Sequence, residues 1–284
     1  MNRSLWIAKT GMEGQQAKLD SISNNLANVA TNGYKRGGVV FEDLMYQNLR
    51  PAGSSTSEQS QLPTGLQVGL GVRAAASTRN LTRGEMLWRA GDQAKSLSVI
   101  KTGLVKVVRP AARGRASICG IFGPPDTVGD LAVLRGIAYP ADAIVATDSA
   151  TVICIPGILL TDPSTQSTPL AMSMACAMHT KLAALHDKVE VLSAGSVEAR
   201  LATLLIKLYD RFGDDFDDGS HSIPVALSRR ELAELVATAF ETAIRVMTRW
   251  EREGVLVTTA HGFTVNRLET LRAAAGGDGA DALI

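Results

Sequence analysis

The stretch LSRRELAELVATAFETAIRVMTRWERE, from Leu227 to Glu253, decides how the chain folds. Ser228 and Glu231 form an S-x-x-E capping box, in which a hydroxyl and a carboxylate each bond a backbone amide that a helix start leaves unpaired. This pattern predicts a short helix from Ser228 and a turn at Ala237-Thr238-Ala239.

A second helix is predicted from about Phe240 to Glu253. Its apolar residues recur at steps of three and four, so one side packs inward: Ala243, Val246, Met247 and Trp250. The opposite side carries Glu241, Thr242, Arg245 and Arg249. A helix fits the major groove of DNA, where Arg donates to guanine and a carboxylate accepts from cytosine. The alternative is an ordinary amphipathic helix, with Glu241 and Arg245 as an i,i+4 pair worth ~0.3 kcal/mol.

The segment after Gly254, VLVTTAHGFTVNRL, predicts two short strands around Ala260-His261-Gly262. Helix, turn, helix and hairpin together resemble the winged-helix domain of the Crp/Fnr family of bacterial transcription regulators. The matching motifs are S-R-R-E at 228–231, E-T-A-I-R at 241–245 and W-E-R-E-G-V-L at 250–256. The resemblance implies that Glu241 and Arg245 read bases.

Two departures from that family leave the preferred operator open. Phe240 stands where some members carry a base-reading Arg, and Ala237 replaces a frequent turn glycine. The wing and the helix cap are expected to touch phosphates. The predicted DNA-contacting residues are Ser228, Arg229, Thr238, Phe240, Glu241, Thr242, Arg245, Arg249 and His261.

Composition bounds the other possibilities. The 284 residues have a net charge of +1 and 45 % apolar content, which is typical of an ordinary globular protein with two or three domains. From Arg229 to Glu253 five Arg face five Glu, so non-specific attraction to phosphate is expected to be modest. No segment has the ~20 apolar residues of a membrane span, and a cytoplasmic protein is expected.

The three cysteines, Cys119, Cys154 and Cys176, show no C-x-x-C pair or metal-ligand spacing. We therefore expect no metal site, and we expect Cys119 and Cys154 to be buried thiols. Some Fnr-like regulators hold an iron–sulfur cluster on clustered N-terminal cysteines. Because this chain has no cysteine there, no such cluster is expected.

The first 80 residues resemble a different family, that of the flagellar distal-rod protein. The matching segments are SLWIAKTGMEGQQ, SISNNLANVATNGYKR, VFEDLMYQNLR and QLPTGLQVGLGVR. Residues 1 to about 35 carry a heptad seam that predicts a helix in need of a partner. In that family the partner is a C-terminal helix of the same chain, whereas AAAGGDGADALI at the end of this sequence lacks heptads and is expected to be flexible.

The two resemblances meet near Thr78 to Glu85, so we interpret the chain as a chimera. Recombination, an engineered fusion and an assembly error all remain open, as does whether the rod-like segment is functional.

From Leu81 to Pro156, short strands separated by glycines predict a β-sandwich or barrel. A G-D near residue 91, K-T-G at 101–103 and V-G-D-L-A at 128–132 resemble the Crp/Fnr sensor jelly roll. The resemblance implies an effector pocket at Gly129, Asp130, Leu131, Ala132, Tyr139 and Pro140. The phosphate-binding Arg of the cyclic-nucleotide-binding members has no counterpart in residues 136–143, so another effector, or none, is expected.

A long helix is predicted from about Pro169, and the resemblance implies that it is the dimer helix. Its apolar stripe must be buried, and a symmetric partner is one way to bury it. Packing only on its own jelly roll is the alternative. The predicted dimer residues are Met174, Met178, Leu182, Leu185, Val189 and Leu192.

The predicted fold class is α+β, with an N-terminal helical arm and extended segment (1–79), a cyclic-nucleotide-binding-like jelly roll (80–168), a dimerisation helix (169–195), a winged helix-turn-helix (196–272) and a tail (273–284). The predicted function is a homodimeric, sequence-specific DNA-binding transcription regulator. It would bind a palindromic operator in double-stranded DNA and contact RNA polymerase. A flagellar rod subunit is the alternative. An enzyme of the cupin type is not expected, because no His precedes residue 179 to complete a metal triad.

Overall fold

The computed structural model describes residues 3–31, 34–43, 46–50, 55–57, 60–61, 66–69, 72–110, 116–161, 168–216 and 219–276. The chain divides into two compact units. The first comprises Met1–Asn80 with Ile153–Pro156, and the second comprises Leu81–Val152 with Gly157–Ile284. None of the described helices is long and apolar enough to cross a membrane.

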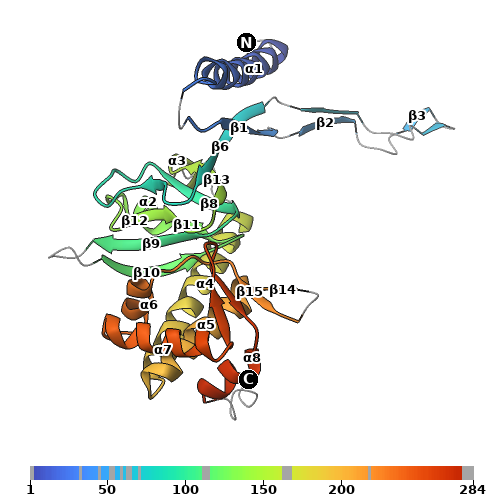
Figure 1. Cartoon of the computed structure of the whole chain (residues 1–284). Helices are drawn as coiled ribbons and strands as arrows, with labels where there is room; N and C mark the ends of the chain where they lie inside the picture. Colours follow the sequence, from blue (N-terminus) through green and yellow to red (C-terminus); the bar gives the residue numbers. More distant parts are fainter. Residues whose placement is uncertain are drawn as a thin grey trace. The chain divides into compact units, whose positions relative to one another are not determined.

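The first unit consists of a helix and antiparallel strands (Figure 1). Helix α1 spans Arg3–Ala27, so it ends earlier than the predicted residue 35. Strand β1 (Gly37–Asp43) pairs with β6 (Val72–Thr82). Between them lie the hairpin strands β2 (Tyr46–Arg50), β3 (Ser55–Ser57), β4 (Ser60–Gln61) and β5 (Leu66–Gly69). The extended segment predicted from Arg50 to Gly71 falls largely on these strands and on residues outside the described ranges.

Asn25 fixes the return of the chain from α1 to β1. Its amide donates to the Gly37 carbonyl at 2.8 Å and accepts from the Gly37 amide at 3.0 Å. The Tyr34 hydroxyl donates to the side-chain oxygen of Asn25 at 2.8 Å, and Ser21 donates to the Gly37 carbonyl at 3.3 Å. Asn25 of the N-N-L-A-N motif and Tyr34 therefore hold the start of β1 against the end of α1.

The heptad seam of α1 is largely exposed, although Ile22 and Leu26 also line a pocket between α1 and β1. The exposed fractions of the large apolar seam residues within α1 run from 52 % at Ile22 to 73 % at Met12. The face that packs toward the strands carries small and polar residues, among them the buried Gly14 and the half-buried Ser21 and Asn25. Within the single chain the seam thus has the exposure expected of a helix that needs a partner.

The second unit begins with the predicted jelly roll. Strands β10 (Ala116–Phe122), β9 (Val105–Pro110), β12 (Asp142–Val145) and β7 (Met86–Trp88) form one sheet in that order. Strands β13 (Ser149–Pro156), β8 (Ser96–Thr102) and β11 (Thr127–Val128) are neighbours in the other, and the short helix α2 (Asp130–Arg135) follows β11. At the K-T-G turn Gly103 has a φ of 76°, and a Cβ there would lie 2.2 Å from the Ser149 carbonyl oxygen.

The prediction that Cys119 and Cys154 are buried was wrong for Cys119, which is exposed, while Cys154 is half-buried. Cys119 lies on β10 between the buried Ile118 and the half-buried Gly120. A register shift between these neighbours bends the strand and turns the intervening side chain outward.

Helices α3 (Ile158–Thr161) and α4 (Thr168–Ser193) lead from the roll to the C-terminal elements. These are α5 (Val197–Phe212), α6 (Arg229–Leu235), α7 (Phe240–Arg252) and α8 (Leu268–Ala274), with the strands β14 (Asp214–Asp215), β15 (His221–Ile223), β16 (Leu256–Thr258) and β17 (Phe263–Val265). The sheet order is β14-β15-β17-β16, so the predicted wing, β16–β17, is part of a larger sheet. The predicted tail lies, from residue 277 onward, outside the described residues.

One apolar core joins the roll to the winged helix. Leu104, Val108, Ile118 and Ile121 of the roll belong to the same buried cluster as Leu205, Leu232, Met247 and Trp250. Figure 1 shows α6 directly beneath β10. The winged helix is therefore seated on its own sensor roll by continuous packing.

Ala237 provides a test of backbone strain in the helix-turn-helix. Its φ is 51°, a left-handed conformation that disfavours a Cβ by roughly 1–2 kcal/mol. Ala237→Gly removes that strain but adds unfolded-state entropy, so a net stabilisation of about 0.5 kcal/mol is expected. Urea unfolding measures the change in unfolding free energy, with Ala273→Gly as the matched control, since Ala273 is an exposed residue within helix α8. The control should lose stability, and a loss at both positions would contradict the strain assignment.

Candidate DNA-reading helix and effector pocket

Helix α7 presents a polar face because its other face is buried. Ala243 and Met247 have no exposed surface and Trp250 is 2 % exposed. Glu241 and Arg245 are exposed. In the part of the chain that the structure describes, no hydrogen bond or ion pair involves either side chain. A guanidinium and a carboxylate one turn apart are thus exposed and unpaired within the described residues.

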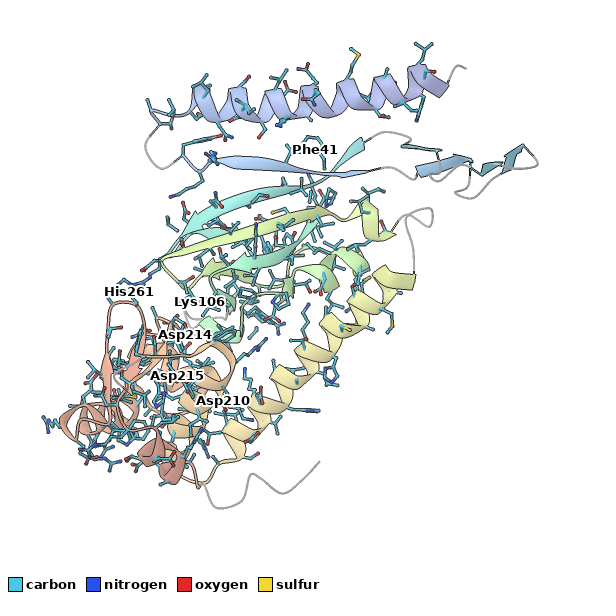
Figure 2. All side chains as sticks on the ribbon, turned by 90° about the vertical axis from the view of Figure 1, so that its right-hand side faces the viewer. Phe41, Lys106, Asp210, Asp214, Asp215 and His261 are labelled. Atoms are coloured by element: carbon cyan, nitrogen blue, oxygen red, sulfur yellow. The ribbon has the colours of Figure 1, made fainter. Side chains whose placement is uncertain are left out.

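The predicted capping box is present. The Ser228 hydroxyl accepts from the Glu231 amide at 3.2 Å, and the Glu231 carboxylate accepts from the Ser228 amide at 2.8 Å. The Glu231 carboxylate also pairs with Lys106 of β9. Burial alone would raise the pKa of Glu231, but the hydrogen bonds from Lys106 and Ser228 outweigh it and hold the pKa below its ordinary value. Figure 2 shows Lys106 where the roll meets the winged helix.

Because the folded-state pKa of Glu231 is depressed, its contribution to stability is complete above the unfolded pKa of roughly 4 and is lost as pH falls through the folded value. Lys106→Met should therefore destabilise the protein most at neutral pH. The difference in unfolding free energy from the wild type should shrink below about pH 4. Chemical denaturation between pH 3 and pH 7, with Lys101→Met of exposed Lys101 as control, measures this. A difference that is constant with pH would contradict the assignment.

Two of the arginines predicted to contact DNA already have partners. Arg229 is half-buried, 2.5 Å from Glu251 and 2.7 Å from the Thr258 hydroxyl, so it ties α6 to α7 and the wing. Arg249 is ion-paired with Glu198 of α5, and that bond raises its pKa. Both positions are occupied because a neighbouring element brings an acidic side chain that sequence spacing does not reveal.

Arg230 is a cation that the sequence prediction missed. It is exposed, and its guanidinium carbon lies 5.9 Å from the ring centroid of Phe240, which is 40 % exposed. Phe240 begins α7, and the Arg230 guanidinium lies over its ring, so a positive charge stands next to the first turn of the helix. The remaining predicted residues of this face, Thr238 and Thr242, are half-buried.

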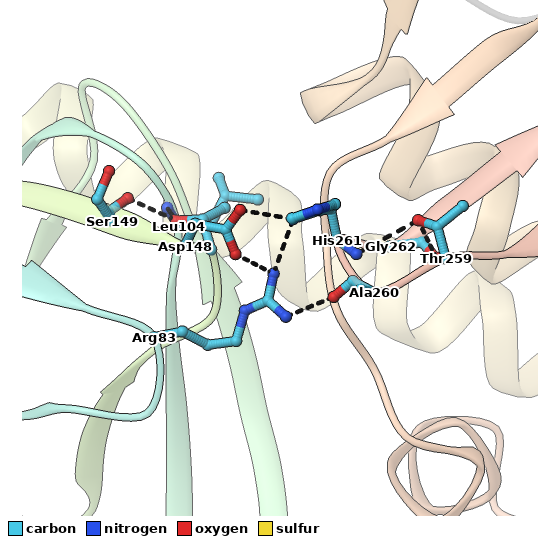
Figure 3. Close-up of polar contacts among 9 residues, drawn as sticks. Arg83, Leu104, Asp148, Ser149, Thr259, Ala260, His261 and Gly262 are labelled. Carbon is cyan, nitrogen blue, oxygen red and sulfur yellow. Dashed lines mark hydrogen bonds and ion pairs between the residues drawn. The ribbon is translucent and has the colours of Figure 1, made fainter.

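The wing residue His261 is exposed, but it contacts the roll. Its Nδ1 lies 2.5 Å from an oxygen of Asp148, and Arg83 lies beside it (Figure 3). His261, which was predicted to contact phosphate, is therefore paired with an acidic side chain in this structure.

The residues predicted to form the effector pocket all line one cavity of about 110 Å³. Gly129 has a φ of 82° and begins α2, and Tyr139 is buried against Trp88 with ring centroids 4.2 Å apart. Asp130 is 8 % exposed and pairs with Lys181 of α4. Trp88 and Lys181 were not predicted from the sequence, because both reach the cavity from elements far from Gly129 in the sequence. Lys181 lies on the face of α4 that packs on the roll.

This cavity does not fit a cyclic nucleotide. Ligand pockets of drug-sized molecules occupy roughly 300–1,000 Å³, whereas the stacked rings of Trp88 and Tyr139 leave about 110 Å³. Among the described residues that line it, Lys181 carries the positive charge, and Asp130 already neutralises it. A phosphate would have to displace that carboxylate.

Helix α4 carries the predicted dimer seam on an exposed face. The exposed fractions range from 36 % at Leu192 to 62 % at Val189, and Met174 is half-buried. The opposite side of α4 contacts the roll through Lys181 and through Lys188, which donates to the Ile118 carbonyl at 3.2 Å. Packing on its own roll therefore leaves the seam uncovered. Within the described residues, no cluster of three metal-ligating side chains is present.

Three family models match the chain. A cyclic nucleotide-binding domain matches residues 78–160 and a Crp-like helix-turn-helix domain matches residues 199–274. The flagella basal body rod protein family matches residues 5–35.

The transcriptional activator protein Anr of Pseudomonas aeruginosa is 30 % identical over 202 residues, covering 70 % of this chain and 80 % of Anr. The chain belongs to the Crp/Fnr family of transcription regulators. The fumarate and nitrate reduction regulatory protein of Salmonella typhi is 27 % identical over 69 % of this chain and 77 % of that protein. A CRP-family transcriptional regulator of Thermus thermophilus shares the fold, with a TM-score of 0.59, 24 % identity and coverage of 72 % of this chain and 99 % of that one.

The N-terminal part of this Crp/Fnr-family chain has other relatives. The flagellar basal-body rod protein FlgG of Buchnera aphidicola subsp. Acyrthosiphon pisum is 48 % identical over 107 residues, which cover 38 % of this chain and 40 % of FlgG. The chain thus spans about two-fifths of the length of that rod protein. Rod-like and regulator-like sequences are joined in one chain, which confirms the chimera predicted from the motifs.

Proposed function

We propose that the protein is a homodimeric regulator that binds double-stranded DNA in a sequence-specific way through α7. The outward pair of Glu241 and Arg245 carries this proposal, because neither side chain has a partner among the described residues. Arg245 donates to a guanine and Glu241 accepts from a cytosine. Ser228, Arg230 and the wing contact the DNA backbone, which positions the helix without reading sequence.

Two copies joined through α4 place two α7 helices in successive major grooves, about one DNA turn apart. The operator is then palindromic. As a transcription regulator the protein would contact RNA polymerase and act in the cytoplasm. The protein acts by binding rather than by catalysis. The sensor roll takes a small effector other than a cyclic nucleotide, or none. The limits of roll, dimer helix and winged helix are proposed at residues 80–168, 169–195 and 196–272.

Arg245→Ala tests the reading of bases. The variant should relax base preference at one position per half-site and weaken binding by about 1–3 kcal/mol, because one bidentate contact is lost. Operators are first selected from random DNA with the wild-type chain and then titrated with each variant. Arg252→Ala, which removes an exposed arginine from the last turn of the same helix, is the control. Equal affinity and equal selectivity for Arg245→Ala would refute the proposal.

The dimer seam is tested with Leu185→Glu. Leu185 is 57 % exposed on the seam, so a carboxylate there should convert a dimer into monomers that bind a single half-site weakly. Ala183→Glu, also exposed but on another side of α4, should remain dimeric. Size-exclusion chromatography with light scattering distinguishes the species. A monomeric wild type, or a dimer that survives Leu185→Glu, would exclude this seam.

A second function is favoured by the rod-like first unit and its identity with FlgG. The exposed heptad seam of α1 would take a helix of a neighbouring subunit, and the chain would then assemble as a rod component. The same light-scattering experiment separates the two functions, since a rod component forms polymers whereas a regulator stays a discrete dimer.

A further inference from the structure

The tip of the wing is bonded to the sensor roll. Arg83, just after β6, donates to the Ala260 carbonyl and to the Asp148 carboxylate. His261 lies 2.5 Å from the other Asp148 oxygen and 3.3 Å from the Arg83 guanidinium. These four residues, which we call the wing latch, come from three separate segments of the sequence and meet in one place (Figure 3).

Each side of the wing latch is held in place before the two sides meet. On the roll, the Arg83 amide donates to the Asp148 carbonyl at 3.1 Å. The adjacent Thr147 hydroxyl accepts from the Leu104 amide at 2.9 Å. On the wing, the Thr259 amide donates to the Gly262 carbonyl at 2.9 Å. A Cβ on Gly262 would lie 2.0 Å from the Ile223 carbonyl oxygen, so the hairpin is pressed against β15. Both sides are therefore preformed surfaces.

The wing latch and DNA compete for the same groups. The wing tip is the part of a winged helix that the proposed function brings to the phosphates, and here it is bonded to a carboxylate. Asp148 is 61 % exposed, so its charge is also directed at any phosphate that approaches the wing. The Arg83 guanidinium, which would attract a phosphate, is already neutralised.

We propose that the wing latch is an autoinhibitory contact, in which Arg83 and Asp148 hold the wing tip on the sensor roll until it opens and the tip binds the DNA backbone. This rests on the proposed function, because it regulates the same DNA-binding surface. Opening is local: the shared apolar core and the more buried Lys106–Glu231 pair keep the winged helix seated on the roll.

The exposure of the wing latch sets the size of its effect. Arg83 is 36 % exposed and His261 is 71 % exposed, and exposed ion pairs contribute little to stability. Closing the latch should therefore lower the apparent affinity for DNA by roughly two- to fivefold, because only the open fraction binds. Because the closed latch is favoured only slightly over the open one, an effector or DNA itself can shift this equilibrium.

Arg83→Ala tests the wing latch by whether it raises or lowers the affinity for DNA. If the latch restrains the wing, the variant should bind a selected operator two- to fivefold more tightly although it has lost a positive charge. If there is no latch, losing a cation beside the wing leaves the affinity for anionic DNA unchanged or weaker. Arg135→Ala, which removes an exposed arginine at the end of α2, is the matched control and should not bind more tightly.

Asp148→Asn supplies the coupling measurement. It should also strengthen binding, but its effect and that of Arg83→Ala should not add, because both open the same contact. Amide hydrogen exchange at residues 259–262 of the DNA-free protein should become faster in both variants. Additive effects, unchanged exchange or weaker binding by Arg83→Ala would overturn the latch. Arg245→Ala in the same titration separates the outcomes: if it too changes nothing, the proposed function itself fails.

Discussion

The burial of one face of α7 is the constraint on which the rest of the molecule depends. Met247 and Trp250 sit in the core shared by the roll and the winged helix, and a helix with 3.6 residues per turn cannot rotate without exposing them. That rotation fixes Glu241 and Arg245 on the solvent side. The same core includes residues of the roll, and α6 packs on β10, so the proposed DNA-reading face and the roll are joined by continuous packing.

Local patterns predicted much of this arrangement. The capping box, the two helices and their turn, the wing hairpin and the strands of the roll each follow from residues within about ten positions of one another. The six effector-pocket residues also meet around one cavity, because the V-G-D-L-A turn and Tyr139 are close in sequence. Periodicity and turn chemistry act at this range, so they are visible in a single sequence.

The partners of the charged side chains were not predictable in the same way. Asp130 and Lys181 are 51 positions apart, and Arg83 and His261 are 178 apart. Their pairing depends on how complete elements pack, which no spacing rule encodes. Arg229 shows the consequence: it has the residue type and position of a phosphate contact, yet Glu251 and Thr258 hold it inside the domain. A prediction from residue charge alone therefore includes too many DNA-contacting residues, because it ignores which side chains are buried or already paired.

Among the described residues, four ionic contacts connect the roll with elements outside it: Asp130 with Lys181 of the long helix, Asp126 with Arg211 of α5, Lys106 with Glu231 of the helix cap, and Arg83 and Asp148 with the wing tip. They differ in exposure, and this difference orders them by strength, since a pair shielded from water is screened less than an exposed one. The wing tip is the most exposed and so the first to part, whereas the apolar core and the cap contact hold. In such an arrangement the sensor roll can change the availability of the wing without any rearrangement of α7, whose reading face stays set by Met247 and Trp250.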